Sequence, residues 1–190
     1  MSLRLVTPAA ALAVSLAEAK LHIRVDHSEE DALITAMITS ATETCEQITG
    51  RALMPQTWDL TLDEFPDVIE LTRVPVASIT TLTYTDSAGA TQTLTANTQY
   101  RLRTVDDYSS AFVVPAYGLE WPETREDIGV VALRFVAGYA NAAAVPEPIK
   151  AWIKIAVASM YENRTDEVQR QSVSLKFVDG LLDRYKVYQL

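Results

Sequence analysis

The sequence predicts an α+β fold, a helical bundle with an inserted antiparallel β block and a C-terminal arm. Amphipathic helical patterns fill most of the first 50 residues, residues 56–140 change to a strand-like pattern, and an apolar helical pattern begins near residue 149. Helices and strands are therefore segregated along the chain, which indicates α+β rather than alternating α/β. With 190 residues, we expect one domain over residues 15–164, between an N-terminal arm (1–14) and a C-terminal arm (165–190).

The first two helices are predicted over residues 15–25 and 29–49. Ser15 and a glutamate three residues later form a capping-box pattern at the start of the first helix. Ser28 is the expected N-cap of the second helix, and acidic residues fill its first turn, where the helix dipole favours negative charge. Apolar residues then recur at three- and four-residue steps until Gly50, which suits a left-handed helix end.

The β block is expected to start with an alternating strand that carries Trp58, Leu60 and Leu62 on one face. Further short strands are expected at residues 69–71, 79–85, 90–95, 100–103 and 112–115. An exposed hairpin turn is expected at Asp86, Ser87, Ala88 and Gly89, because this composition is typical of tight turns. Residues 128–139 are apolar on both faces except at Arg134, which predicts a central strand covered on both sides.

The third helix is predicted over residues 149–163. Its residues are apolar almost all round, which is typical of a helix buried in a core or against a partner. Residues 165–174 are polar, and the chain then becomes apolar again towards its end. A polar stretch followed by an apolar one is expected of a segment that orders on a partner.

Composition and charge exclude several classes of protein. The net charge is −9, with 16 Lys+Arg against 25 Asp+Glu and no basic run, which argues against a protein that binds nucleic acid by neutralising phosphates. No apolar run approaches the roughly 20 residues of a membrane span. The single cysteine, Cys45, excludes an internal disulfide framework and a cysteine-rich zinc site.

Catalytic and cofactor patterns are missing. The sequence has no glycine-rich phosphate loop, nucleophile elbow or zinc-protease motif. His22 and His27 are five residues apart and do not share a helical face. Asp63 and Glu64 are adjacent, so on a strand they point to opposite faces and cannot converge on one substrate bond. We therefore expect no enzymatic activity, no metal and no cofactor.

Several segments have an order and spacing that are known from one protein family. They are SLAEAKLHIRVD at 15–26, ATETCEQITGRAL at 41–53, and shorter pieces at 56–58, 65–66, 74–76, 84–86, 137–139, 145–146 and 161–164. Together they resemble the head-to-tail connector (adaptor) proteins of long-tailed, non-contractile phages and of related gene transfer agents. The resemblance runs from about residue 12 to residue 188, nearly the whole chain.

The resemblance implies a structural role in the virion. Such adaptors form a ring of about a dozen copies beneath the portal protein, and the ring is a platform for a tail-proximal stopper. Double-stranded DNA passes through the channel without sequence-specific binding. The family has no catalytic residues to carry over, its members assemble at the head-tail interface after synthesis in the bacterial host cytoplasm, and its C-terminal segment docks on the portal. The residues in the matching position here are Phe177, Leu181, Leu182, Tyr185 and Tyr188.

Two further sets of residues are predicted at contacts between subunits. The apolar third helix has more apolar surface than a small domain easily covers, so several of its residues are expected to be buried, some of them between subunits. These residues are Ile149, Trp152, Ile153, Ile155 and Met160. Arg51 and Arg164 end helices, where a cation suits the dipole, and either could also bridge subunits.

Two alternatives stay open at this point. The chain could be another phage structural protein, such as a stopper, a tail terminator or a minor capsid component, and direct contact with the portal would distinguish an adaptor from these. It could instead be a small ligand-binding module or an unrecognised enzyme. That reading requires a concave pocket with converging polar groups.

Overall fold

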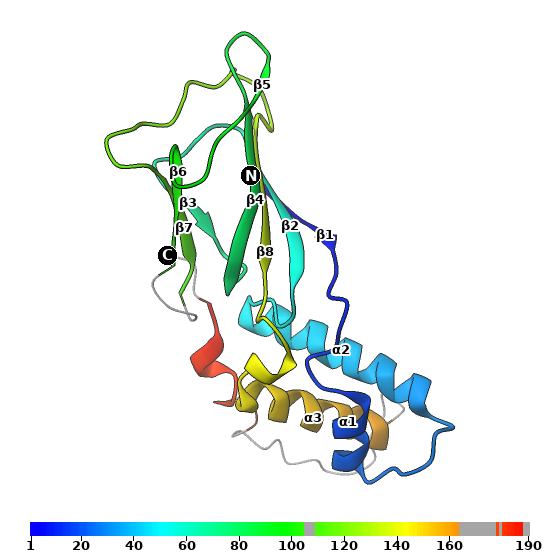
Figure 1. Cartoon of the computed structure of the whole chain (residues 1–190). Helices are drawn as coiled ribbons and strands as arrows, with labels where there is room; N and C mark the ends of the chain where they lie inside the picture. The colour runs from blue at the N-terminus through cyan, green and yellow to red at the C-terminus, as the bar shows by residue number, and fades with distance from the viewer. Residues whose placement is uncertain (105–108, 164–177, 179, 188–190) are drawn as a thin grey trace.

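The chain folds into a helical layer at one end and a β block that extends away from it (Figure 1). The computed structural model describes residues 1–104, 109–163, 178 and 180–187. The helices in this part of the chain are α1 (Leu16–Ile23), α2 (Asp31–Thr49) and α3 (Glu147–Glu162). All the strands between α2 and α3 belong to the β block, which confirms the segregated α+β fold with an inserted β block.

Helix α1 begins as the sequence predicts. The Ser15 hydroxyl accepts a hydrogen bond from the Glu18 backbone N–H at 3.2 Å, and Glu18 Oε2 accepts one from the Ser15 backbone N–H at 2.8 Å. The hydrogen bond from the Ser15 side chain lowers the pKa of Glu18. Arg24, in the left-handed conformation with φ 59°, ends the helix two residues earlier than expected.

Helix α2 begins two residues later than predicted, and Ser28 is not its N-cap. The N-cap is Glu30, which makes no side-chain capping bond. Ser28 instead forms a turn in which its carbonyl oxygen accepts a hydrogen bond from Asp31 N at 3.2 Å. The carboxylates of Glu29 and Glu30 face His27, so these residues belong to the α1–α2 loop. Gly50 ends the helix at φ 73°, as predicted.

The three helices pack together around one apolar cluster, the helical cluster. Its fully buried members include residues from every helix of the described chain, namely Ala19, Ile34, Ile38, Cys45, Ile149, Ile153 and Val157. Complete burial of a valine or isoleucine side chain contributes about 1.5–3 kcal/mol to the stability of the fold. The one-sided burial of α2 follows from its apolar period, as the sequence indicates.

A five-stranded antiparallel sheet forms the larger part of the β block. Its order is β1-β2-β8-β4-β5. The strands are β1 (Ser2–Thr7), β2 (Gln56–Leu62), β8 (Val131–Ala137), β4 (Val76–Thr85) and β5 (Thr91–Thr93). The predicted N-terminal arm is therefore in part a strand, because residues 2–7 pair with β2 along one edge of the sheet.

A second sheet of three antiparallel strands packs on one face of the first. Its order is β3-β7-β6, from β3 (Ile69–Leu71), β7 (Ala111–Pro115) and β6 (Tyr100–Arg103). Leu60, Leu82 and Phe135 of the larger sheet share one buried cluster with Ile69 and Val113 of the smaller one. The core of the β block thus lies between two sheets.

The predicted double-sided burial of β8 is wrong. The strand is central in its sheet, but its burial alternates, and the side chains of Ala132 and Arg134 are exposed. Only the face towards the second sheet is covered. On the open face Arg134 is bound to Asp59 of β2, with Nε 2.7 Å from the Oδ1 atom.

The β block joins the helical layer through a close backbone contact. Gly138 follows β8 with φ 127°, and a Cβ atom at this position would lie 2.2 Å from the carbonyl oxygen of Met54. No side chain fits there, so glycine is required for the two segments to approach. The chain then turns through a 3-10 helix (Ala142–Ala144) into α3.

Candidate interaction surfaces

Two of the α3 residues predicted at a subunit interface belong to the protein's own core. Ile149 and Ile153 are fully buried in the helical cluster. The expected burial is present, but its cause is intramolecular packing against α1 and α2. These two side chains are not accessible to a neighbouring subunit in this conformation.

The other three α3 residues are half-buried. Trp152 and Met160 pack against the edge of the helical cluster. Ile155 is half-buried as well but belongs to neither apolar cluster in the described part of the chain. Trp152, Ile155 and Met160 therefore keep part of their apolar surface for a neighbour, and Ile155 is the one that packs against neither cluster.

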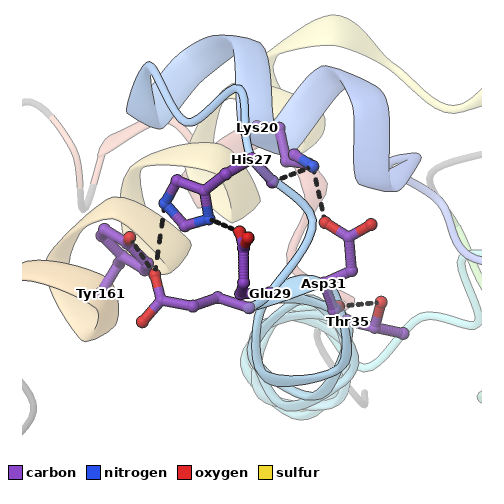
Figure 2. Close-up of polar contacts among 7 residues, drawn as sticks. Lys20, His27, Glu29, Asp31, Thr35 and Tyr161 are labelled. Carbon is purple, nitrogen blue, oxygen red and sulfur yellow. Dashed lines mark hydrogen bonds and ion pairs between the residues drawn. The ribbon is translucent and has the colours of Figure 1, made fainter.

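The loop between α1 and α2 is bound to α1 by the half-buried ammonium group of Lys20. Figure 2 shows the Lys20 ammonium between the loop and the start of α2. Lys20 Nζ donates to the His27 carbonyl oxygen at 2.5 Å and to Asp31 Oδ1 at 2.6 Å. The Lys20 side chain is 17% exposed, so this ion pair is partly shielded from water.

The same loop is tied to the end of α3. His27 Nδ1 lies 2.9 Å from Glu29 Oε2, and its Nε2 atom lies 4.0 Å from Glu30 Oε2. The Tyr161 hydroxyl donates a hydrogen bond to Glu30, and Figure 2 shows this tyrosine reaching the loop from α3. These polar contacts hold α1, the α1–α2 loop and the end of α3 in place relative to one another, so their role is structural.

Arg51, predicted to cap a helix or bridge subunits, is an internal residue. It is fully buried just after α2. Its Nε donates a hydrogen bond to the Tyr185 carbonyl oxygen at 2.5 Å, and Nη1 lies 3.4 Å from the Tyr139 hydroxyl. A side chain that is held inside the chain cannot bridge subunits, so that alternative is wrong for Arg51 in this conformation. Arg164, its predicted counterpart, lies outside the described residues.

The end of the described chain folds back onto the helical layer. Leu182 and Tyr185 are 1% and 7% exposed and belong to the helical cluster. Val187 N donates to the Thr49 carbonyl oxygen at 2.8 Å, beside the end of α2. In this conformation these two predicted docking side chains pack within their own chain, and their contact with the portal stays a prediction.

The remaining predicted docking residues differ in placement. Leu181 is half-buried. Phe177 and Tyr188 lie outside the described residues. Residues 183–185 form a short 3-10 helix.

The hairpin turn between β4 and β5 is built on Asp86. Its Oδ1 atom accepts hydrogen bonds from the backbone N–H groups of Ala88 and Ala90 at 3.0 and 2.8 Å. The hydrogen bond from the Gln92 side chain, together with these backbone bonds, lowers the pKa of Asp86. Ser87, Ala88 and Gly89 are exposed, so the turn presents a rigid tip to solvent.

Glu46 is a half-buried acid that the sequence prediction did not single out. Its Oε1 atom accepts hydrogen bonds from Leu53 N at 2.7 Å and from Gln56 Nε2 at 2.8 Å. Burial raises its pKa, although both hydrogen bonds act in the opposite direction. Glu46 thereby fastens α2 to the start of β2. Its place on the boundary of the apolar stripe, between Cys45 and Ile48, was the available signal.

The described residues can be compared with two kinds of binding site. They contain no group of three or more His, Cys, Asp or Glu side chains that could hold a metal ion. A cavity of about 310 Å³ beside β2 and β3 is lined mostly by apolar side chains, with Glu70 and Thr72 as its polar ones. Among the helices that the structure describes, none is long and apolar enough to cross a membrane.

Comparisons with known proteins identify a family of structural proteins. The family model of the phage gp6-like head-tail connector protein matches residues 13–112. No curated protein matches the chain. Among solved structures, a chain in the neck of an empty gene transfer agent (GTA) particle, computed with C6 symmetry, is similar with a TM-score of 0.81 and 26% identity.

Two further solved structures are similar over the same extent. A chain in the virion of a native GTA particle has a TM-score of 0.80 and 27% identity, and one in the neck of a native GTA particle, computed with C12 symmetry, has 0.78 and 26%. Each of the three similarities covers 100% of this chain and 97% of the other. The similarity thus includes the helical layer, the β block and the C-terminal segment.

Proposed function

This chain belongs to the phage gp6-like head-tail connector proteins, and we propose that it is one subunit of a ring beneath the portal of its particle. It is a structural adaptor that joins the head to the tail. The observation that carries the ring proposal is the full-length similarity to neck structures computed with C6 and C12 symmetry. Symmetric rings are built from repeated copies of one chain, and we propose about a dozen copies here.

The domain limits and the lateral contacts are part of this proposal. Residues 15–164 act as the connector domain together with the strand at residues 2–7, and residues 165–190 act as the C-terminal arm. Ile155, with the exposed parts of Trp152 and Met160, contributes to the contact between neighbouring subunits. Arg164, two positions beyond α3 in the sequence, is proposed to bridge to the next copy.

The C-terminal arm is proposed to dock on the portal. Leu181, which is half-buried, is available without rearrangement. Leu182 and Tyr185 reach the portal only after the segment leaves the helical cluster. Phe177 and Tyr188 extend the same apolar set. Docking through all five residues therefore exchanges an intramolecular apolar contact for an intermolecular one.

The ring is proposed to leave a central channel for double-stranded DNA. A dozen copies at −9 each carry roughly −100 in total, and acids that face the channel would oppose adhesion of DNA. The exposed turn at residues 86–89 is proposed to reach towards the tail-proximal stopper or an adjacent subunit. We propose no catalytic activity, since the family consists of structural connectors.

The place of action is the neck of the virion, where the similar structures were found. We propose that the chain is made in the bacterial host cytoplasm and joins the particle after DNA packaging.

Native mass spectrometry of the chain mixed with the portal ring from the same genome tests the proposal. We expect many copies bound per portal ring, and loss of that binding when residues 175–190 are deleted. A matched Ser87→Ala variant, altered only in the exposed turn, should bind like the unaltered chain. Binding that survives the deletion would move the docking surface elsewhere in the chain. No binding to an intact portal ring would contradict the adaptor position.

A further inference from the structure

The five-stranded sheet has two unpaired edges in the described part of the chain. One is the outer side of β1, which pairs only with β2. The other is the lower part of β4, residues 77–81, because β5 pairs only with Thr83, Tyr84 and Thr85. Figure 1 shows these edges on opposite sides of the sheet, both close to the helical layer. Unpaired strand edges expose backbone donors and acceptors that can pair with another chain.

The two edges lie at the same level of the sheet. The backbone pairing connects them row by row through β2 and β8. Leu5 is in the same row as Trp58, Phe135 and Ile79, while Arg4 is in the row of Asp59, Arg134 and Thr81. Three antiparallel steps separate β1 from β4, so these two strands run in opposite directions.

From this match we infer that β1 of one subunit pairs antiparallel with residues 77–81 of β4 in the next subunit. The inference rests on the proposed ring. The occupant of each edge is then a second copy of this chain, and the larger sheets of neighbouring subunits join into one. Inward-facing residues meet inward-facing ones, so the buried row that ends at Ile79 continues into Leu5 of the neighbour.

The side chains on both edges suit such pairing. Residues 77–81 are Ala, Ser, Ile, Thr and Thr, without the charge or proline that commonly protects an edge strand. Leu5 and Val6 of β1 are 42% and 37% exposed, although they are apolar.

The dimensions are consistent with a ring around DNA. An interface between two different surfaces of one subunit is heterologous, and it closes when the rotation per copy divides a full turn. Four strands at about 4.8 Å each add roughly 19 Å of sheet per copy. With twelve copies, as in the C12 neck, the circumference is about 230 Å and the radius about 37 Å. That radius leaves room for a duplex at the centre.

Disulfide trapping of the assembled protein tests the inference. We combine Arg4→Cys with Thr81→Cys, which lie in one row on the open face of the sheet. Within one copy they are three strands apart, about 14 Å, which is too far for a disulfide. The native Cys45 is fully buried and does not interfere. We expect oxidation to give a ladder of covalent multimers in a non-reducing gel.

The matched control combines Arg4→Cys with Thr83→Cys. Thr83 lies further along β4, where β5 occupies the outer side, so this pair should give no ladder. Hydrogen exchange provides a second measurement without substitutions. We expect amides in residues 2–7 and 77–81 to exchange at least about tenfold more slowly in the assembled protein than in the monomer.

The outcomes separate this inference from the proposed function. Subunits that assemble into rings, but show neither a ladder nor slower exchange at the two edges, would overturn the edge pairing and leave the connector role intact. A chain that stays monomeric at every concentration, both alone and with its portal ring, would overturn the edge pairing and the proposed ring together.

Discussion

Arg51 binds the backbone of Tyr185 across 134 positions of sequence, with Nε 2.5 Å from the carbonyl oxygen. The arginine is fully buried at the junction of α2 and the β block. The contact holds the C-terminal segment beside the end of α2, and the hydrogen bond from Val187 N to the Thr49 carbonyl oxygen supports it. The segment proposed to dock on the portal is therefore held against the helical layer by these two hydrogen bonds.

Replacing Arg51 should loosen this contact. We expect Arg51→Ala to reduce the free energy of unfolding by about 3 kcal/mol, because it leaves a buried carbonyl without its donor and opens a cavity. Urea denaturation measures the change. Arg101→Ala, at an exposed position in β6, is the control and should stay within about 0.5 kcal/mol of the unaltered chain. An equally small effect at Arg51 would contradict the role of this contact.

The apolar anchor of the segment is expected to be Leu182. Leu182→Ala should cost about 2–5 kcal/mol, as for other fully buried leucines, whereas Leu181→Ala at the half-buried neighbour should cost less. Denaturation of the two variants gives the comparison. Equal costs at both positions would show that the segment does not rest on the helical layer as described.

Glu46 should make the stability fall as the pH rises. Burial raises its pKa in the folded chain above the ordinary value of 4.5, so the folded state binds a proton more readily than the unfolded state. The free energy of unfolding that protonated Glu46 contributes is therefore lost as the pH rises from 4.5 to the higher pKa of the folded state. Glu46→Gln should remove that part of the pH dependence. Denaturation curves across this range measure it, and identical slopes for both proteins would exclude the effect.

Cys45 should be unreactive in the folded chain. It is fully buried, and burial raises the pKa of its thiol to about 12, so little thiolate forms near neutral pH. A thiol reagent such as dithionitrobenzoate should label it only as the protein unfolds, with a rate that follows the urea concentration. Rapid stoichiometric labelling of the native protein would contradict this burial.

Local sequence signals predicted most of the elements. The capping box at Ser15, the helix end at Gly50 and the alternating strand through Trp58, Leu60 and Leu62 all depend on neighbours within a few positions. The structure confirms all three. The start of α2 was predicted wrongly at Ser28, because the nearby carboxylates bind His27 and Tyr161 instead of serving the helix. Competing long-range partners decided that boundary.

Contacts between residues far apart in the sequence could not be predicted from local sequence patterns. The strand at residues 2–7 exists because β2 offers it an edge, and its own composition resembles an extended arm. β8 looked apolar on both faces because Ala132 and Val136 do not reveal an open side. The burial of Arg51 by a segment 134 residues away has no local signal. The resemblance to connector proteins succeeded because it rests on many short segments in order.

This chain joins the head of a particle to its tail. The most direct measurement is electron microscopy of particles from producing cells in which its gene is deleted, with and without a copy supplied in trans. We predict separate heads and tails in the deletion strain and tailed particles once the copy is restored. Complete tailed particles in the absence of the chain would contradict a role in joining head and tail.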